Sequence, residues 1–387
     1  MNRAILLLIA FLAIFAESLL APFYPMYFER VFQIHNANAV GWYIAACRIV
    51  FMAAYPIWAI ISKRYSIGNI LVCTQGIAGL ICIACAYSAG YTFFFVLSLL
   101  MVFFKASYLL IYPYLIQNSS SRYKEISVLG IILHIGMISA TFISSIWVGQ
   151  FQIQYLFLII AAFDFAQMLL SYYFLLPLKA TPVSEKIIDE NRTEKFSLLR
   201  IGVLTLFLYL LSTTLRPFYT EFIMNQKIYV HTILQAGCLF VLPSLSVILF
   251  YLIFRKGNAS TSNGVLMLVA TLFAGTVWLQ QYEVLFIAAC LIRIAYGFFL
   301  FYLCVYLDMA FFKSAGSTQV AVWYGIIHAI QNTAYLAAPL FAGQQIQQHG
   351  LHVQFHIAFI LSLLFLSITI ITSISFKNKQ HSYEAIQ

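Results

Sequence analysis

Charged residues are scarce in this chain of 387 residues, because only 9% of the sequence is Asp, Glu, Lys or Arg, whereas 63% is hydrophobic. About a quarter of the residues of an average soluble domain are charged, so this chain lacks the polar side chains needed to cover a globule of its size. Disorder is excluded for the opposite reason, because so much apolar surface cannot stay in contact with water. The composition predicts an integral membrane protein with the lipid bilayer as its solvent.

The motifs of soluble catalysis and metal binding are also missing. The sequence has no nucleotide-binding glycine-rich loop, no Gly-x-Ser-x-Gly and no His-Glu-x-x-His. Cys82 and Cys85 form a CxxC without a second pair. His349, His352 and His356 share a helical face, but no nearby carboxylate or cysteine completes a set of metal ligands. We therefore predict no enzyme, no metal and no cofactor, and an ion gradient as the source of energy.

Long apolar runs dominate the chain. A helix needs about 20 apolar residues to cross a bilayer, and twelve runs have this character. They lie at 4–27, 39–62, 68–88, 92–117, 126–149, 155–176, 200–223, 230–254, 263–280, 283–311, 318–343 and 352–375. The sequence predicts an all-α membrane protein with twelve transmembrane helices.

The basic residues support this number of spans. If both ends of the chain lie on one side, the loops of that side hold 15 Lys and Arg residues, and the opposite loops hold only Arg30 and Lys227. Membrane proteins collect Lys and Arg in cytoplasmic loops, so we expect both termini in the cytoplasm. We expect the membrane to be a bacterial inner membrane. The same rule accounts for the formal net charge of +9, and we predict no nucleic acid as a partner.

An internal repeat divides the spans into two groups of six. The longest polar stretch, Pro177–Lys195, separates them, and a shift of 195 residues aligns Leu20–Tyr24 with Leu215–Tyr219 and Gly130–Ile132 with Gly325–Ile327. Parallel repeats of this kind are related by an axis along the membrane normal. We predict two pseudo-symmetric six-helix bundles, at 1–176 and 200–376, joined by a cytoplasmic linker at 177–199 and followed by a tail at 377–387.

The chain resembles the major facilitator superfamily over its whole length. The resemblance rests on the twelve spans, their division, the charged linker and the basic loop Trp58–Ser66 after span 2, where the family carries Gly-x-x-x-Asp-Arg-x-Gly and only Arg64 matches. It implies a monomeric secondary transporter in which spans 1, 4, 7 and 10 line a cavity. The span 1 segment Pro22–Pro25 is similar to small importers of siderophores and cell-wall fragments, and span 5 lacks the Gly-Pro motif of drug/proton antiporters.

Charged residues inside spans are the candidate functional residues, because each costs about 2.5–3.5 kcal/mol at mid-bilayer. We expect Lys105 and Arg293, on spans 4 and 10, to face each other across a polar cavity and to bind a carboxylate or phosphate of the solute, with Arg216 on span 7. The alternative is that acids and bases pair and hold helices together. Polar residues predicted to complete the solute site are Tyr24, Tyr108, Tyr112, Tyr219, Gln331 and Asn332.

Acidic residues inside spans are candidates for coupling to protons, because a carboxyl group in a low-dielectric site can bind and release a proton near neutral pH. Glu17, midway along span 1, is the first choice, and Asp164 and Asp308 are the reserves. For Arg48 we predict a structural ion pair, for example with Glu17.

Together these features predict a proton-coupled secondary transporter of a small organic solute. The favoured substrate is an anionic or metal-chelating molecule, such as a siderophore, imported by symport through alternating access. The second hypothesis is efflux of amphipathic drugs or metabolites by proton antiport. The third is a transport-inactive membrane sensor or structural protein, in which Lys105 and Arg293 are each buried against an acid.

Overall fold

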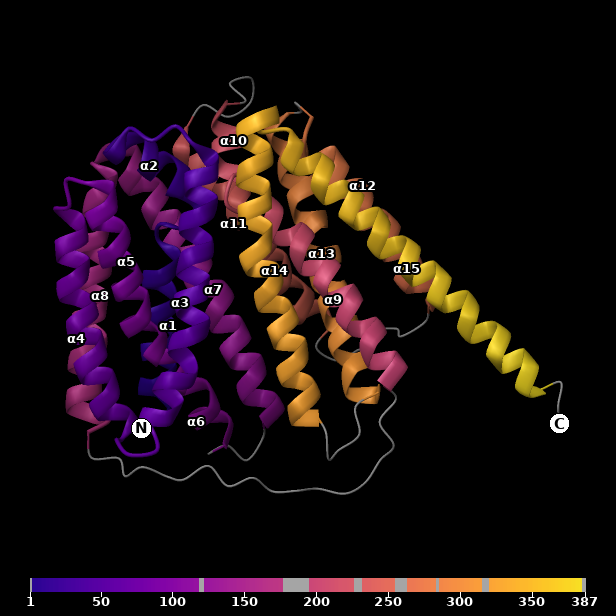
Figure 1. Cartoon of the computed structure of the whole chain (residues 1–387), viewed down its shortest axis with the longest axis horizontal. Coiled ribbons are helices and arrows are strands. Elements are labelled where there is room, and N and C mark those ends of the chain that lie inside the picture. Colours follow the sequence, from indigo (N-terminus) through magenta and orange to yellow (C-terminus); the bar gives the residue numbers. More distant parts are fainter. Residues whose placement is uncertain are drawn as a thin grey trace. The chain divides into compact units, whose positions relative to one another are not determined.

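A computed structural model describes residues 2–117, 122–176, 195–225, 232–254, 263–282, 285–314 and 320–384. Every regular element in these ranges is an α-helix or a 3-10 helix (Figure 1), which confirms the all-α prediction. Of the predicted linker, 177–194 lies outside the described residues, as do the last three residues of the predicted tail.

The first six predicted spans correspond to helical segments in the same order. Spans 1 and 4 are each divided into shorter pieces, whereas the other four contain one long helix. The elements are α1 (Asn2–Ser18), η1 (Ala21–Phe23), α2 (Tyr24–Phe32), α3 (Ala37–Ile61), α4 (Ile67–Ala86), α5 (Tyr91–Lys105), η2 (Ala106–Leu110), α6 (Ile111–Gln117), α7 (Arg122–Gln150), η3 (Ile153–Tyr155) and α8 (Leu156–Phe174).

The last six predicted spans correspond to the remaining helices. These are α9 (Lys195–Leu215), α10 (Tyr219–Asn225), α11 (Ile233–Phe254), α12 (Asn263–Leu279), α13 (Phe286–Ser314), α14 (Val320–His349) and α15 (Val353–Glu384). Within the described ranges, ten helical stretches are long and apolar enough to cross a membrane, and Gly264–Leu279 is a shorter apolar helix. Because α15 continues to Glu384, most of the predicted tail extends the last helix.

Helix starts follow from polar side chains at the caps. The Asn36 carboxamide oxygen accepts hydrogen bonds from the backbone N–H groups of Asn38 and Ala39, at 2.9 and 3.3 Å, and so caps α3. The Ser66 hydroxyl oxygen accepts one from the Asn69 N–H at 3.2 Å and caps α4. Such caps satisfy N–H groups that have no partner inside the first turn.

Contacts divide the chain into two compact units. Unit 1 comprises Met1–Glu185 and Pro217–Ser244, and unit 2 comprises Lys186–Arg216 and Leu245–Gln387. By these contacts the segment 217–244 belongs to unit 1, and the predicted bundle boundaries at 1–176 and 200–376 stay a prediction. One reason is that α10 packs against η1 of the first span.

In unit 1, α4 and α8 pack together closely along their length. Three glycines of α4 allow this approach: a Cβ atom at Gly68 would lie 2.5 Å from the Leu175 backbone, one at Gly76 2.9 Å from Met168 Sδ, and one at Gly79 3.0 Å from the Phe165 ring. Small residues bring transmembrane helices within close packing distance. These two helices therefore form a tightly fitted pair.

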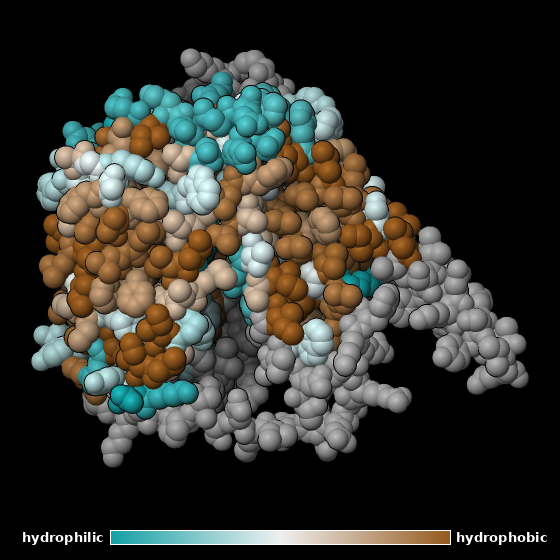
Figure 2. Space-filling view, viewed as in Figure 1, coloured by the Kyte–Doolittle hydropathy of each residue, from teal (hydrophilic) through white to brown (hydrophobic). Residues whose placement is uncertain are grey.

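Hydrophobic side chains cover the middle of the helices on the face seen in Figure 2, and hydrophilic side chains gather near helix ends. Large apolar residues such as Leu80, Phe93 and Val96 are 60–62% exposed. An apolar surface of this kind is expected where the solvent is hydrocarbon.

Candidate functional site

The two interrupted spans of unit 1 place charged residues at their breaks. Glu17 is the penultimate residue of α1, and the chain then passes through η1, which carries Pro22, before α2 begins. Lys105 is the last residue of α5, directly before the 3-10 helix η2. Irregular backbone at membrane depth is tolerated only where protein or water satisfies it, and 3-10 stretches inside helices often mark hinges. Both breaks therefore point to the same region as the candidate site.

Glu17 lies at the centre of a polar cluster. Its side chain is exposed, and the Tyr108 hydroxyl donates a hydrogen bond of 2.9 Å to Glu17 Oε2. Tyr108 itself is only 7% exposed. Glu17 and Arg48 both interact electrostatically with Tyr24 and with Tyr108.

The side chains around this cluster come from four elements. Tyr24 begins α2 and contacts Tyr43 of α3, with ring centres 5.3 Å apart. Arg48 of α3 is half-buried, and its guanidinium lies 6.0 Å from the centre of the Phe51 ring. Tyr112 of α6 is partly buried and interacts with Glu17. The structure thus brings together five of the residues predicted from the sequence, on α1, α2, α3, η2 and α6.

Lys105 forms a buried ion pair with Asp164 of α8. Lys105 Nζ lies 2.5 Å from Asp164 Oδ1, and the two side chains are 11% and 0% exposed. The Cys82 thiol donates to the other carboxylate oxygen at 3.3 Å, and the Gln167 amide donates to Oδ1 at 3.5 Å. Lys105 was predicted to contact solute and Asp164 to carry protons. The structure joins them in one contact, and both roles stay predictions.

Arg293 of α13 is also buried and engaged with neighbours inside unit 2. It is 5% exposed, donates a 2.7 Å hydrogen bond to Gln280 Oε1, and lies 5.2 Å from the centre of the Tyr296 ring. The predicted facing of Lys105 and Arg293 across a cavity stays a prediction, since the two residues belong to different units.

The other predicted site residues occupy several environments. Arg216 is exposed between α9 and α10, and Tyr219 is 2% exposed in α10. Asp308 is exposed on α13 of unit 2. Gln331 and Asn332 are half-buried on α14, and the Asn332 amide donates to the His328 carbonyl one turn earlier.

Sequence reasoning missed the polar partners of the buried charges. Gln167 and Gln280 were not singled out, although each bonds a charged group. A second polar network was not predicted: the Thr74 and Ser107 hydroxyls lie 2.7 Å apart, and the Gln75 amide donates to Ser107 Oγ at 3.2 Å. The available signal was a polar residue in mid-span, because buried polar groups in proteins are generally hydrogen-bonded.

A protein-family model supports the fold and places this chain in a known class of transporters. The Major Facilitator Superfamily model matches residues 6–321. The chain belongs to this family. Together with its apolar helices, the match makes it a multi-pass integral membrane protein and a transporter of small molecules, not an enzyme.

Solved structures of the same fold include three transporters. The nucleoside transporter NupG has 16% sequence identity and a TM-score of 0.75, over 97% of this chain and 100% of that one. The human organic anion transporter MFSD10 has 15% identity and a TM-score of 0.67, over 95% and 98%. A bacterial homolog of the human lysosomal transporter Spinster, inward-facing and unoccupied, has 11% identity and a TM-score of 0.74, over 97% of each chain. A comparison with curated protein sequences finds no match.

Proposed function

We propose that this transporter is a proton-coupled symporter that imports an anionic or metal-chelating organic solute, such as a siderophore, across a bacterial inner membrane. Both termini lie in the cytoplasm in this proposal. The family supports the class of small-solute transporter, and the neighbours named for nucleosides and organic anions support an organic solute. The observation that carries the proposal is the exposed carboxylate of Glu17 inside the polar cluster.

The charges of the cluster explain why a proton and an anion would travel together. Glu17 and Asp164 supply two negative charges, and Arg48 and Lys105 supply two positive charges. Lys105 interacts electrostatically with both carboxylates. Uncompensated charge inside a membrane is costly. A monoanionic solute entering this balanced set adds one negative charge, and a proton on Glu17 removes one. Binding of the solute is therefore favoured when Glu17 is protonated.

Glu17 is better placed than Asp164 to exchange protons. Asp164 is fully buried and held by Lys105, Cys82 and Gln167, so solvent has no direct contact with it. Glu17 is exposed at a helix break. When it takes a proton, the charge-assisted hydrogen bond from Tyr108 weakens, and Arg48 and Lys105 lose a counter-charge that the solute can replace.

Solute recognition then centres on the half-buried and exposed members of the cluster. Arg48, predicted to pair with Glu17, loses that counter-charge when Glu17 is protonated, and a carboxylate of the solute replaces it. Tyr24 and Tyr112 offer hydroxyl and ring surfaces in the same cluster. Lys105, which is buried in its ion pair with Asp164, contributes positive charge without contacting the solute. Arg216 and Arg293 remain proposed contacts for the same solute from the second half of the sequence.

Uptake into proteoliposomes tests the proposal. Vesicles carrying the purified chain receive an inward pH gradient, acidic outside, and a panel of radiolabelled ferric siderophores of the hydroxamate, catecholate and carboxylate classes. We expect one class to accumulate, and collapse of the gradient to abolish its accumulation. Glu17→Gln should stop gradient-driven accumulation while solute exchange continues. Asp308→Asn tests the reserve acid, and normal accumulation by this variant excludes Asp308 as the proton carrier.

Three outcomes contradict the proposal. Normal accumulation by Glu17→Gln rejects Glu17 as the proton carrier. Release of amphipathic compounds in exchange for protons, with no siderophore uptake, shows antiport in place of symport. Movement of no solute in either direction, by protein that is folded in the vesicles, indicates a sensor.

A further inference from the structure

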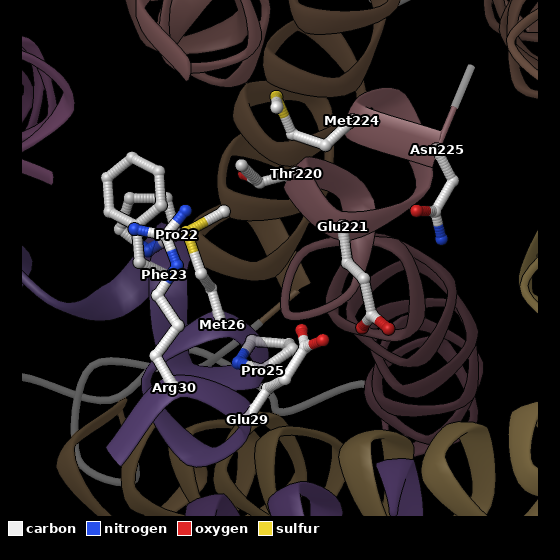
Figure 3. Close-up of a pocket in the computed structure, with 10 residues that line it drawn as sticks. All are labelled: Pro22, Phe23, Pro25, Met26, Glu29, Arg30, Thr220, Glu221, Met224 and Asn225. Carbon is white, nitrogen blue, oxygen red and sulfur yellow. The ribbon is translucent and has the colours of Figure 1, made fainter. Parts of the chain in front are cut away.

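One end of unit 1 holds a pocket with two carboxyl groups. The pocket has a volume of about 260 Å³ and lies between the η1–α2 segment and α10 (Figure 3). In Figure 1, α2 and α10 lie at the end of unit 1 opposite the N terminus. With the predicted orientation of the chain, this end faces outward. The pocket combines the apolar side chains of Met26 and Met224 with the acids Glu29 and Glu221.

The acids face each other with too few hydrogen-bond donors between them. Glu29 comes from α2 and Glu221 from α10, and their carboxyl groups point toward one another in Figure 3. Glu221 is half-buried, and its Oε2 atom is buried without a hydrogen-bond partner. Thr220, which also lines the pocket, is 1% exposed, and its hydroxyl has no partner either. Buried polar atoms without partners are rare and need an explanation.

Among the residues that the structure describes, the other charged groups near this pocket do not neutralise Glu221. Arg30 lines the same pocket, but its guanidinium donates to the Val148 carbonyl at 3.3 Å and turns away from Glu29 in Figure 3. His35 Nδ1 lies 3.5 Å from Glu29 Oε1, where both side chains are more than half exposed. The elements η1 and η3, which pack on α10 and α2, carry no charged residue, and the one charged residue of α3, Arg48, belongs to the Glu17 cluster. Partial burial and the charge of Glu29 raise the pKa of Glu221 to about 7.

We propose that Glu29 and Glu221 form a carboxyl pair that holds one proton, keeps this end of unit 1 closed while the proton is bound, and lets it open when the proton leaves. A neutral carboxyl group can donate a short O–H···O⁻ hydrogen bond to its ionised neighbour. Two ionised carboxylates repel each other, and one of them is then partly desolvated without a partner. On opening, water hydrates both groups and the proton returns to the solution. The pair acts separately from Glu17 and needs no solute.

The direction of the pH effect follows from proton binding. Between pH 4.5, the ordinary pKa of a glutamate, and about pH 7, the pKa of Glu221 in the closed state, the closed state binds more protons than the open state. Closure is therefore favoured at acidic pH and lost as the pH rises. For a hydrated Glu221 in the open state, the ratio of closed to open molecules falls about 70-fold between pH 5 and pH 8. Alkaline solution therefore opens this end.

Thiol accessibility measures the opening without any solute. The variant Met224→Cys puts a thiol in the pocket wall, and Tyr87→Cys puts one on a side chain position that is 67% exposed. Both proteins, whole and in nanodiscs, react with maleimide between pH 5 and pH 8, and mass spectrometry quantifies each modified peptide. The ratio of the two rates removes the effect of pH on thiol reactivity. We expect this ratio to rise tens of fold with pH.

Four further variants, each made in both cysteine backgrounds, identify the group responsible. Glu221→Gln should keep the pocket closed and the ratio low at every pH, and Glu29→Gln should move the midpoint to lower pH because it removes the neighbouring charge. Met26→Leu and His35→Ala should respond as the parent does. A flat ratio in the parent overturns the proposal. So does a parental response in Glu221→Gln, or its loss in His35→Ala. None of these readings depends on solute, so failure of the symport proposal leaves this test intact.

Discussion

Replacing Lys105 with Met removes one partner of the buried ion pair and leaves Asp164, which is 0% exposed, without its cation. Removing one partner of a buried pair costs about 3–5 kcal/mol, because the remaining charge stays desolvated. Asp164→Asn should cost a similar amount by leaving the ammonium of Lys105 uncompensated. Replacing both members with neutral residues is far less costly. The double variant should therefore be more stable than either single variant.

The assay is unfolding in mixed micelles titrated with SDS and followed by tryptophan fluorescence. We expect a coupling free energy of at least about 2 kcal/mol between the two substitutions. Lys63→Met, at an exposed lysine, is the control and should change stability by less than about 0.5 kcal/mol.

Additive effects of the two substitutions refute the ion-pair reasoning. Transport by the double variant then separates the two roles of Lys105. If the pair is structural, the folded double variant retains part of its transport activity. If Lys105 binds solute directly, the double variant is stable and inactive.

Three further predictions concern single contacts. Tyr108→Phe removes the hydroxyl that donates to Glu17, and we expect transport to fall about ten-fold, from a loss of about 1.5 kcal/mol, in the vesicle assay. Gly237→Val places a side chain against Ser145, whose Cβ lies 2.9 Å from the added Cβ. The free energy of unfolding should therefore fall by about 1–3 kcal/mol, measured by thermal unfolding in detergent. An unchanged unfolding midpoint contradicts this prediction. Arg293→Leu leaves Gln280 Oε1 buried without its hydrogen-bond donor, so the free energy of unfolding should fall by about 1–3 kcal/mol. Adding Gln280→Leu removes the buried acceptor and should recover stability.

The helices were predictable because the bilayer fixes their length. Apolar runs of about 20 residues predicted the order and approximate bounds of all twelve segments. Pro22 in span 1 and Pro113 in span 4 predict kinks, but not the 3-10 helix that precedes Pro113. This helix, η2, contains no proline, and its 3-10 geometry next to Lys105 depends on packing with α3 and α4.

The partners of the charged residues could not be read from the sequence. Lys105 and Asp164 are 59 residues apart, and hydropathy gives no information on which face of one helix meets which face of another. Hydropathy therefore does not distinguish a charge that faces a cavity from one that faces a neighbouring helix. Burial separates them: Glu17 is exposed, whereas Lys105, Asp164 and Arg293 are enclosed by protein.

The glycine contact between α4 and α8 limits how unit 1 can change shape. Because α4 and α8 are in close contact at Gly68, Gly76 and Gly79, they have no room to slide or twist past each other. The two helices therefore move as one rigid body. Bending is then left to the places where the backbone ladder is already broken, after Ser18 and at η2. Asp164 lies on the rigid α4–α8 pair, and Glu17 lies next to a point where the chain can bend. The distance between Asp164 and Glu17 should therefore change when the transporter changes conformation.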